Sequence, residues 1–253
     1  MKALAGIKIM KQTDNDNVVT NIKFNDKRLK ITSPAASGNV LTQLKKGRFY
    51  EEKLLSYISR LDLEGVYIDV GANIGNHALF FDMCTKAKKV YAFEAHPEIY
   101  RYLAKNIKAN KSAAMAYHQA VGETAGKCHI VEVASDIIGG ASTAKGGDID
   151  MVPLDSAIKE RVSLVKIDVE GGEIGVIKGM SRILSEDKPE LIIEAADKPF
   201  LKEITTALDP YGYYPIEVFN NTATYHFTTK LKKSSLRYAI YSHYIPRRIM
   251  RNS

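Results

Sequence analysis

The chain has 253 residues, of which 45% are hydrophobic and 26% charged, and this composition fits one α/β domain of a globular protein with additions. Its formal charge is +7, but the segment 230–253 holds seven Lys or Arg and no Asp or Glu, so residues 1–229 are neutral overall and no basic catalytic face is indicated. No apolar run approaches the roughly 20 residues that span a bilayer, and the apolar interval between Lys2 and Lys8 is too short for a secretory signal. Two distant cysteines without a metal-binding pattern favour a reducing compartment.

The N-terminal region is predicted to be a β-hairpin followed by a loop and a helix. Apolar and polar residues alternate in two runs within 17–33, around an Asn-Asp turn. Segment 33–39 is rich in Pro, Ser and Gly, which indicates a loop. The amphipathic segment 49–63 predicts a helix that covers a sheet, and Tyr50 and Glu51 at its start could reach a ligand cleft. A first-turn Glu is also favourable to the helix dipole alone.

The central motif is GVYIDVGANIGN, residues 65–76. A short β-branched strand over 66–70 is followed by a glycine turn and then by a helix, which is the ligand-gripping unit of a parallel α/β sheet. The two turn glycines, Gly71 and Gly75, are spaced G-x-x-x-G, so the dinucleotide fingerprint G-x-G-x-x-G is absent. Asp69 precedes the turn and suits a ligand with an ammonium group better than one with a pyrophosphate.

A second carboxylate follows at the end of the next predicted strand, 90–94. Glu94 lies nineteen residues after Gly75, a spacing at which an acidic residue can accept hydrogen bonds from both hydroxyls of a ribose. A solvated Glu at a strand end is the alternative. A helix over 97–110 with Pro97 in its first turn is predicted next.

The third strand of the sheet is predicted over 115–121, with Gln119 and Ala120 near its end, where an adenine edge would lie. Segment 127–133 alternates and is predicted to be an antiparallel strand. The glycine-rich segment 136–147 shows no periodicity and is predicted to be a mobile loop that orders over a substrate. Two hydroxyls of that loop, Ser142 and Thr143, are candidate substrate-binding groups.

A cluster of charged residues marks the fourth strand, predicted over 162–169. Lys166, Asp168 and Glu170 alternate and are therefore predicted to share one face. A lysine within an apolar strand is costly unless it is paired, and the carboxylates could be its partners. A purely structural ion pair at the strand end is the alternative. Glu173 opens the next helix and could do no more than complement its dipole.

Strands alternate with helices from residue 48 to 212, which predicts a doubly wound, mostly parallel sheet. Its later elements are predicted as a helix over 174–184, a strand over 191–194, a helix over 200–208 and an antiparallel hairpin formed by 213–219 and 224–229. Right-handed crossovers place the ends of the parallel strands at one rim. The polar groups expected there are Asp69, Glu94, Gln119 and Asp168.

Five segments, in this order, resemble the FkbM family of methyltransferases: DVGANIGNH, FEAHPE, LDSAI, KIDVEGGE and PELIIEA. The resemblance spans residues 48–229 and implies a Rossmann-like class I methyltransferase fold with a seven-stranded sheet, S-adenosylmethionine as cofactor with S-adenosylhomocysteine as product, and O-methylation of a hydroxyl on a sugar or natural product. The expected cofactor-binding residues are Asp69, Gly71, Ala72, Asn73, Gly75, Asn76, Glu94, Ala95, Gln119 and Ala120. His96 is given no role.

Three charged residues are assigned to the reaction. An acceptor hydroxyl must lose a proton, and Asp168 is our first choice for the base, Glu170 the second, with Lys166 as their charged neighbour. No metal is expected, because the carboxylates lack a characteristic ligand spacing. The expected division is an N-terminal hairpin extension (1–45), the methyltransferase domain (46–229) and a basic aromatic tail (230–253).

The tail leaves two alternatives open. With its lysines, arginines and tyrosines it could serve an RNA methyltransferase, although residues 1–229 are neutral and contain no recognisable RNA-binding module, so nucleic acid is not the expected partner. Segment 236–250 also interleaves isoleucines with arginines, as in a membrane-surface adaptor whose cofactor fold is degenerate, though Pro246 interrupts it. We favour a solvated tail or a homo-oligomer contact. The protein is expected to be cytoplasmic, with a peripheral location at the inner membrane surface as the variant. It is expected to act on a small-molecule or glycan acceptor.

Overall fold

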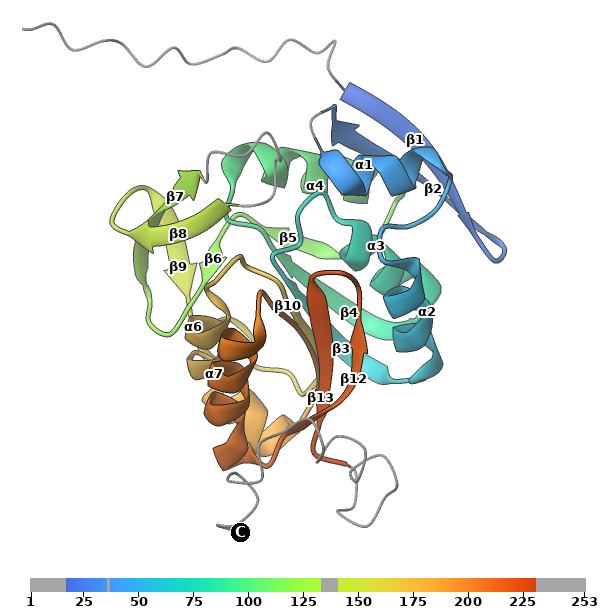
Figure 1. Ribbon diagram of the computed structural model, residues 1–253. Helices are drawn as coiled ribbons and strands as arrows, with labels where there is room; N and C mark the ends of the chain where they lie inside the picture. The colour runs from blue at the N-terminus through green and yellow to red at the C-terminus, as the bar shows by residue number, and fades with distance from the viewer. Residues whose placement is uncertain (1–16, 36, 133–140, 231–253) are drawn as a thin grey trace, which may run out of the picture.

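The computed structural model describes residues 17–35, 37–132 and 141–230, and a seven-stranded sheet forms its centre (Figure 1). The strand order is β12-β13-β11-β10-β3-β4-β5. All neighbours are parallel except β13, which is antiparallel to both β11 and β12. The strands are β3 (Glu64–Val70), β4 (Lys86–Phe93), β5 (Met115–Tyr117), β10 (Val162–Ile167), β11 (Glu190–Ala195), β12 (Tyr214–Phe219) and β13 (Ala223–Thr228). This confirms the predicted mostly parallel sheet and its antiparallel C-terminal hairpin.

Helices cover both faces of this sheet; in Figure 1, α6 and α7 lie on one side and α2 and α3 on the other. The strands can be buried on both faces because their apolar runs are continuous: Val66 and Ile68 pack into one core and Tyr67, between them, into the other. The helices are α1 (Gly38–Lys45), α2 (Glu52–Arg60), α3 (Asn76–Cys84), α4 (Pro97–Ala109), α5 (Leu154–Ala157), α6 (Glu173–Lys178) and α7 (Lys198–Leu208), with a π-helical turn at Ile183–Asp187 and a 3₁₀ turn at Asp209–Tyr211.

The predicted N-terminal hairpin is confirmed as β1 (Asn17–Phe24) and β2 (Lys27–Pro34). It is fastened to α4 by the buried amide of Asn106, which accepts a hydrogen bond from Thr32 N and donates to Thr32 O and to Ile74 O, each at 2.8 Å. One side chain therefore joins the hairpin, α4 and the glycine turn. Helix α1 was not predicted, because the loop signal of 33–39 runs into its start and it buries only Leu41 and Leu44.

A small second sheet lies beside the main one, in the order β6-β9-β7-β8. Its strands are β6 (Ala120–Val121), β7 (Gly126–Glu132), β8 (Ala141–Lys145) and β9 (Ile149–Val152). Two predictions are corrected here. The single strand over 115–121 is divided between β5 and β6, which belong to different sheets. The prediction of a mobile loop over 136–147 is wrong for residues 141–145, which form a strand paired with β7. Periodicity did not reveal this strand, because it is only five residues long and depends on pairing with another segment. The rest of the loop up to residue 140 lies outside the described residues.

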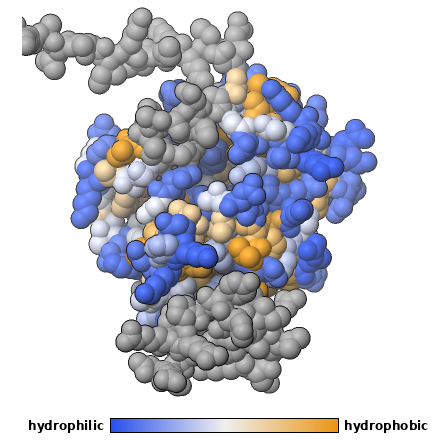
Figure 2. Space-filling model, in the orientation of Figure 1, coloured by the Kyte–Doolittle hydropathy of each residue, from blue (hydrophilic) through white to orange (hydrophobic). Residues whose placement is uncertain are grey.

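No helix in the described part of the chain is long and apolar enough to cross a membrane. On the face seen in Figure 2, hydrophilic and hydrophobic residues are interspersed. The basic tail falls outside the described residues from 231 onwards, so the RNA and membrane alternatives that depend on it stay predictions.

A buried polar network closes the antiparallel end of the sheet. The ring of His226 lies between the Tyr57 hydroxyl, 2.7 Å from Nδ1, and a carboxylate oxygen of Glu190, 2.8 Å from Nε2. Lys230 Nζ contacts the other oxygen of Glu190 at 2.6 Å. Burial by itself would raise the pKa of Glu190, but His226 and Lys230 outweigh it and lower the pKa to about 2.

We expect Glu190→Gln to lower the free energy of unfolding at pH 7 by about 1.5–3 kcal/mol, because the charge-assisted bonds of Glu190 are lost. Since the folded-state pKa is depressed from 4.5, the stability that the carboxylate contributes is present above about 4.5 and is lost as the pH falls towards 2. Urea unfolding at pH 7 and at pH 3 measures the difference in unfolding free energy between the wild type and Glu190→Gln, which should be smaller at pH 3. Glu64→Gln, which breaks an exposed pair with Lys88 at 3.7 Å, is the control. A difference as large at the acid end as at pH 7 would contradict the assignment.

Candidate active site

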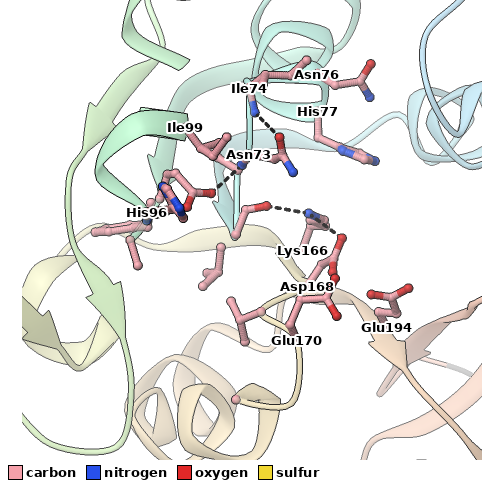
Figure 3. Close-up of a pocket in the computed structure, with 18 of the residues that line it drawn as sticks. Asn73, Ile74, Asn76, His77, His96, Ile99, Lys166, Asp168, Glu170 and Glu194 are labelled. Carbon is pink, nitrogen blue, oxygen red and sulfur yellow. Dashed lines mark hydrogen bonds and ion pairs between the residues drawn. The ribbon is translucent and has the colours of Figure 1, made fainter. Parts of the chain in front are cut away.

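A cavity of about 320 Å³ opens at the carboxyl ends of the parallel strands β3, β4 and β10 (Figure 3). This is the rim at which the sequence predicted a ligand site. Its wall includes three groups of residues: the turn after β3, the segment after β4 with the start of β6, and the carboxylates that follow β10 and lie near the end of β11. Thr143 of β8 completes one side.

The turn after β3 is held by backbone hydrogen bonds and by its glycine. Gly71 N and Ala72 N both donate to Phe93 O, at 3.0 and 2.9 Å. Gly71 has φ +75°, and a Cβ placed on it would lie 1.7 Å from the carbonyl oxygen of Asp168. Only glycine therefore allows the turns after β3 and β10 to approach this closely. Gly71, Ala72 and Asn73 line the cavity, as predicted for cofactor-binding residues.

Gly71→Ala is expected to lower the free energy of unfolding by at least about 1–3 kcal/mol, since the left-handed backbone is strained and the two turns must separate. Gly126→Ala is the matched control, because a Cβ at Gly126 meets nothing within 4 Å. Urea unfolding of both variants measures the effect. Equal stability of the two variants would show that the close approach at Gly71 is not required.

Glu94 anchors the same turn from the end of β4. Its Oε2 accepts a hydrogen bond from Asn73 N and its Oε1 from His96 N, both at 2.8 Å. Burial raises the pKa of Glu94, and these two N–H donors partly offset that rise. Each carboxylate oxygen has a second lone pair, so two further donors can be accepted on the cavity side. The other predicted residues of this side, Ala95, Gln119 and Ala120, also line the cavity.

Three residues predicted to bind the cofactor have other contacts. Asp69 is fully buried and is not among the described residues that line the cavity, because it faces Lys166 on the neighbouring strand. Gly75 is turned towards α4, where its Cβ would lie 2.8 Å from Leu103. Asn76 reaches the cavity wall, but its amide bonds both the N–H and the carbonyl of Tyr50. The positions of residues on strands and turns alone do not show which side chains are already hydrogen-bonded to, ion-paired with or packed against neighbouring residues.

Lys166 is the buried cation of the site. Its Nζ lies 3.3 Å from Asp69 Oδ1, 3.3 Å from Asp168 Oδ2 and 3.1 Å from Gly71 O. Burial by itself lowers the pKa of Lys166, but the carboxylates of Asp168 and Asp69 outweigh it and raise the pKa, so the ammonium stays charged. The ammonium is therefore paired with two carboxylates and donates a hydrogen bond to Gly71 O. The predicted pairing with carboxylates is present, and it ties the glycine turn to Asp168.

Three carboxylates gather opposite the glycine turn. One oxygen each of Asp168, Glu170 and Glu194 lies within 4.8 Å of the other two. Figure 3 shows these side chains converging from the end of β10, the following turn and β11. They also form an oxygen donor set that a hard divalent cation could use. Glu194 was not predicted as a site residue, although it lies near the end of β11, much as Glu94 follows the end of β4.

The predicted reason for the proximity of Asp168 and Glu170, alternation along one strand, was wrong. Strand β10 ends at Ile167, so Glu170 is not placed by strand alternation. It lies instead in a turn with φ +54°. Glu173 closes that turn, since its Oε1 accepts hydrogen bonds from Val169 N and Gly171 N at 3.1 and 3.4 Å. Glu173 thus has a structural role beyond the helix dipole.

The carboxylates differ in their affinity for protons. Burial raises the pKa of Glu194, and a hydrogen bond with Asp168 raises it further. For Asp168 burial acts in the same direction, but Lys166 and the bond from Glu194 outweigh it and lower its pKa. Burial also raises the pKa of Glu170, assisted by the charges of Asp168 and Glu173. Asp168 is therefore the ionised partner of Lys166, and Glu194 holds the proton that the two share.

Two further groups on the wall come from the start of α2 and from α3. Glu51 Oε2 lies 3.0 Å from His77 Nε2, and both side chains line the cavity together with Tyr50. The sequence pointed to Tyr50 and Glu51 but not to His77. Of the two predicted substrate-binding hydroxyls, Thr143 lines the cavity, whereas Ser142 is not among the described lining residues. Neighbours on a strand point to opposite faces, so one of the pair is turned away.

The strand order and the cavity at its switch point define a class I methyltransferase fold. The family model of the methyltransferase FkbM domain matches residues 69–215, and the chain belongs to this family.

The chain is similar to two curated methyltransferases and to one of the solved structures. It is 28% identical over 127 residues to the hexuronic acid methyltransferase AglP of Haloferax volcanii, a match that covers 48% of this chain and 52% of AglP. It is 23% identical over 200 residues to the methyltransferase sdnD of Sordaria araneosa, covering 62% and 76% of the two chains. The crystal structure of the methyltransferase FkbM from Methylobacillus flagellatus KT is 22% identical with a TM-score of 0.49, covering 64% of this chain and 42% of that one. The chain thus spans about half the length of AglP.

Proposed function

We propose that the protein is an S-adenosylmethionine-dependent O-methyltransferase that acts on a hydroxyl of a sugar or glycan. The observation that carries the proposal is that one cavity is lined both by a glycine turn anchored by Glu94 and by a cluster of carboxylates around Asp168. The first side suits a nucleoside and the second a group that must lose a proton. The similarity to a methyltransferase named for hexuronic acid supports a sugar acceptor.

In the proposed complex, the ribose hydroxyls donate to the free lone pairs of Glu94, and the adenine lies against Gln119 and Ala120. The methionine portion follows the turn of Gly71 to Asn73. When bound, the cofactor supplies a methyl group already activated by its sulfonium, so the chain's main task is to align the acceptor oxygen. Lys166 contributes by holding that turn and Asp168 in one arrangement.

For the proton transfer, the structure changes our order of preference. Asp168 has a lowered pKa because it is paired with Lys166, which makes it a weak base. Glu170 has a pKa raised by burial and is not part of the Lys166 ion pair, so it takes a proton more readily than Asp168. We therefore assign the general base to Glu170 and the orientation of the acceptor hydroxyl to Asp168.

The test is a two-stage experiment on the full chain. Calorimetry should detect binding of S-adenosylhomocysteine, and mass spectrometry of nucleotide sugars and oligosaccharides incubated with S-adenosylmethionine should detect the mass of one added methyl group. Absence of cofactor binding would refute the proposal, and methyl transfer to RNA in place of the sugars would replace it with the RNA alternative.

A further inference from the structure

The carboxylates of the cavity wall are not all equally available to an acceptor. The described residues that line the cavity include five carboxylates: Glu51, Glu94, Asp168, Glu170 and Glu194. Glu94 is engaged by two backbone N–H groups, and Glu51 lies against His77. The remaining three converge within 4.8 Å on the acceptor side. Even though Asp168 and Glu194 share one proton, the two negative charges of Asp168 and Glu170 exceed the single positive charge of Lys166.

The charge of Lys166, a cation on the cavity wall, is already balanced by carboxylates. Lys166 Nζ donates a hydrogen bond to the Gly71 carbonyl and lies 3.3 Å from carboxylate oxygens of Asp69 and Asp168, so its charge is already paired. His96 also lines the cavity, and its Nδ1 accepts a hydrogen bond from Glu98 N. Among the described lining residues there is no arginine and no lysine other than Lys166.

We propose, on the basis of the proposed function, that the acceptor is a neutral or amino-bearing polyol, and that Glu170, besides taking the proton, is a specificity-determining residue which rejects acceptors with a carboxylate or phosphate beside the methylated hydroxyl. Such an anion would face Glu170 and the Asp168–Glu194 pair without a cation to balance it, and a buried charge without a partner is strongly disfavoured. Hydroxyl and ammonium groups would instead donate to these oxygens. The preference would therefore differ from that in the name of AglP.

Three probes of matched shape test the charge preference: methyl glucoside, methyl glucosaminide and methyl glucuronide. The pH is kept below the pKa of the glucosaminide amine, so that this probe is a cation. Their dissociation constants are measured by ligand-observed NMR on protein saturated with S-adenosylhomocysteine, in EDTA. We expect the glucosaminide to bind at least tenfold more tightly than the glucuronide, with the glucoside between them. Glu170→Gln should reduce this ratio severalfold, and Glu203→Gln, which removes the same charge from an exposed position on α7, should leave it unchanged.

Several results would overturn the inference. They are equal or tighter binding of the glucuronide, a ratio that Glu170→Gln does not alter, and absence of binding by all three probes. Binding of the glucuronide only after Mg²⁺ replaces EDTA would also overturn it, by showing that the carboxylates hold a cation. S-adenosylhomocysteine binding is measured first: its failure would refute the proposed function itself, whereas normal cofactor binding with a glucuronide preference would refute only the acceptor class.

Discussion

Glu170→Gln is expected to reduce kcat about 10²–10⁴-fold at saturating cofactor and acceptor, because the amide keeps the shape of the side chain and cannot take the proton. The dissociation constant of S-adenosylhomocysteine should change little, since Glu170 lies across the cavity from the turn held by Glu94. Steady-state kinetics paired with calorimetry on the same protein separates the two quantities.

The pH dependence gives a second signature of Glu170. The base must be ionised, and its pKa is raised above the ordinary 4.5 by burial and by Asp168 and Glu173. The wild-type rate should therefore fall as the pH drops through that raised pKa, and Glu170→Gln should lose this limb.

Asp168→Asn is the comparison. It removes one partner of Lys166 and one of Glu194, so we expect both a lower kcat and weaker cofactor binding through the Gly71 turn. A variant of Glu170 with wild-type kcat beside an inactive Asp168→Asn would restore Asp168 as the base.

Glu94→Ala is expected to weaken S-adenosylhomocysteine binding tenfold or more. The variant loses two bonds to the ribose, each contributing about 1.5–3 kcal/mol when the acceptor is charged, and it also frees Asn73 N from the carboxylate that positions the turn. Calorimetry measures the loss, and thermal unfolding verifies that the variant is folded.

Two further variants sharpen the result for Glu94. Glu94→Gln keeps one acceptor oxygen, so its affinity should lie between those of wild type and Glu94→Ala. Glu98→Ala, an exposed carboxylate in the first turn of α4, should bind normally. Undiminished binding by a folded Glu94→Ala would remove Glu94 from the ribose site.

The site was predictable wherever one strand and its turn decide a position. Gly71 and Glu94 follow short β-branched strands, and parallel strands bring their carboxyl ends to one rim, so local patterns were enough to place both on the cavity. The same reasoning failed for Asp69. Whether a strand-end carboxylate faces a ligand or a lysine depends on the register of β3 against β10, which pairs Asp69 with Lys166 across ninety-seven residues of chain.

The sequence by itself therefore determined the alternating strands and helices, the antiparallel end of the sheet, the rim that carries the ligand and the resemblance to the FkbM methyltransferases, because each depends on periodicity or on short contiguous motifs. Only the tertiary structure decided that Glu194 joins Asp168 and Glu170, that Lys166 is paired with both Asp69 and Asp168, and that 141–145 is a strand. Each of these depends on groups brought together from distant segments, where burial and neighbouring charges set proton affinity and the available hydrogen bonds.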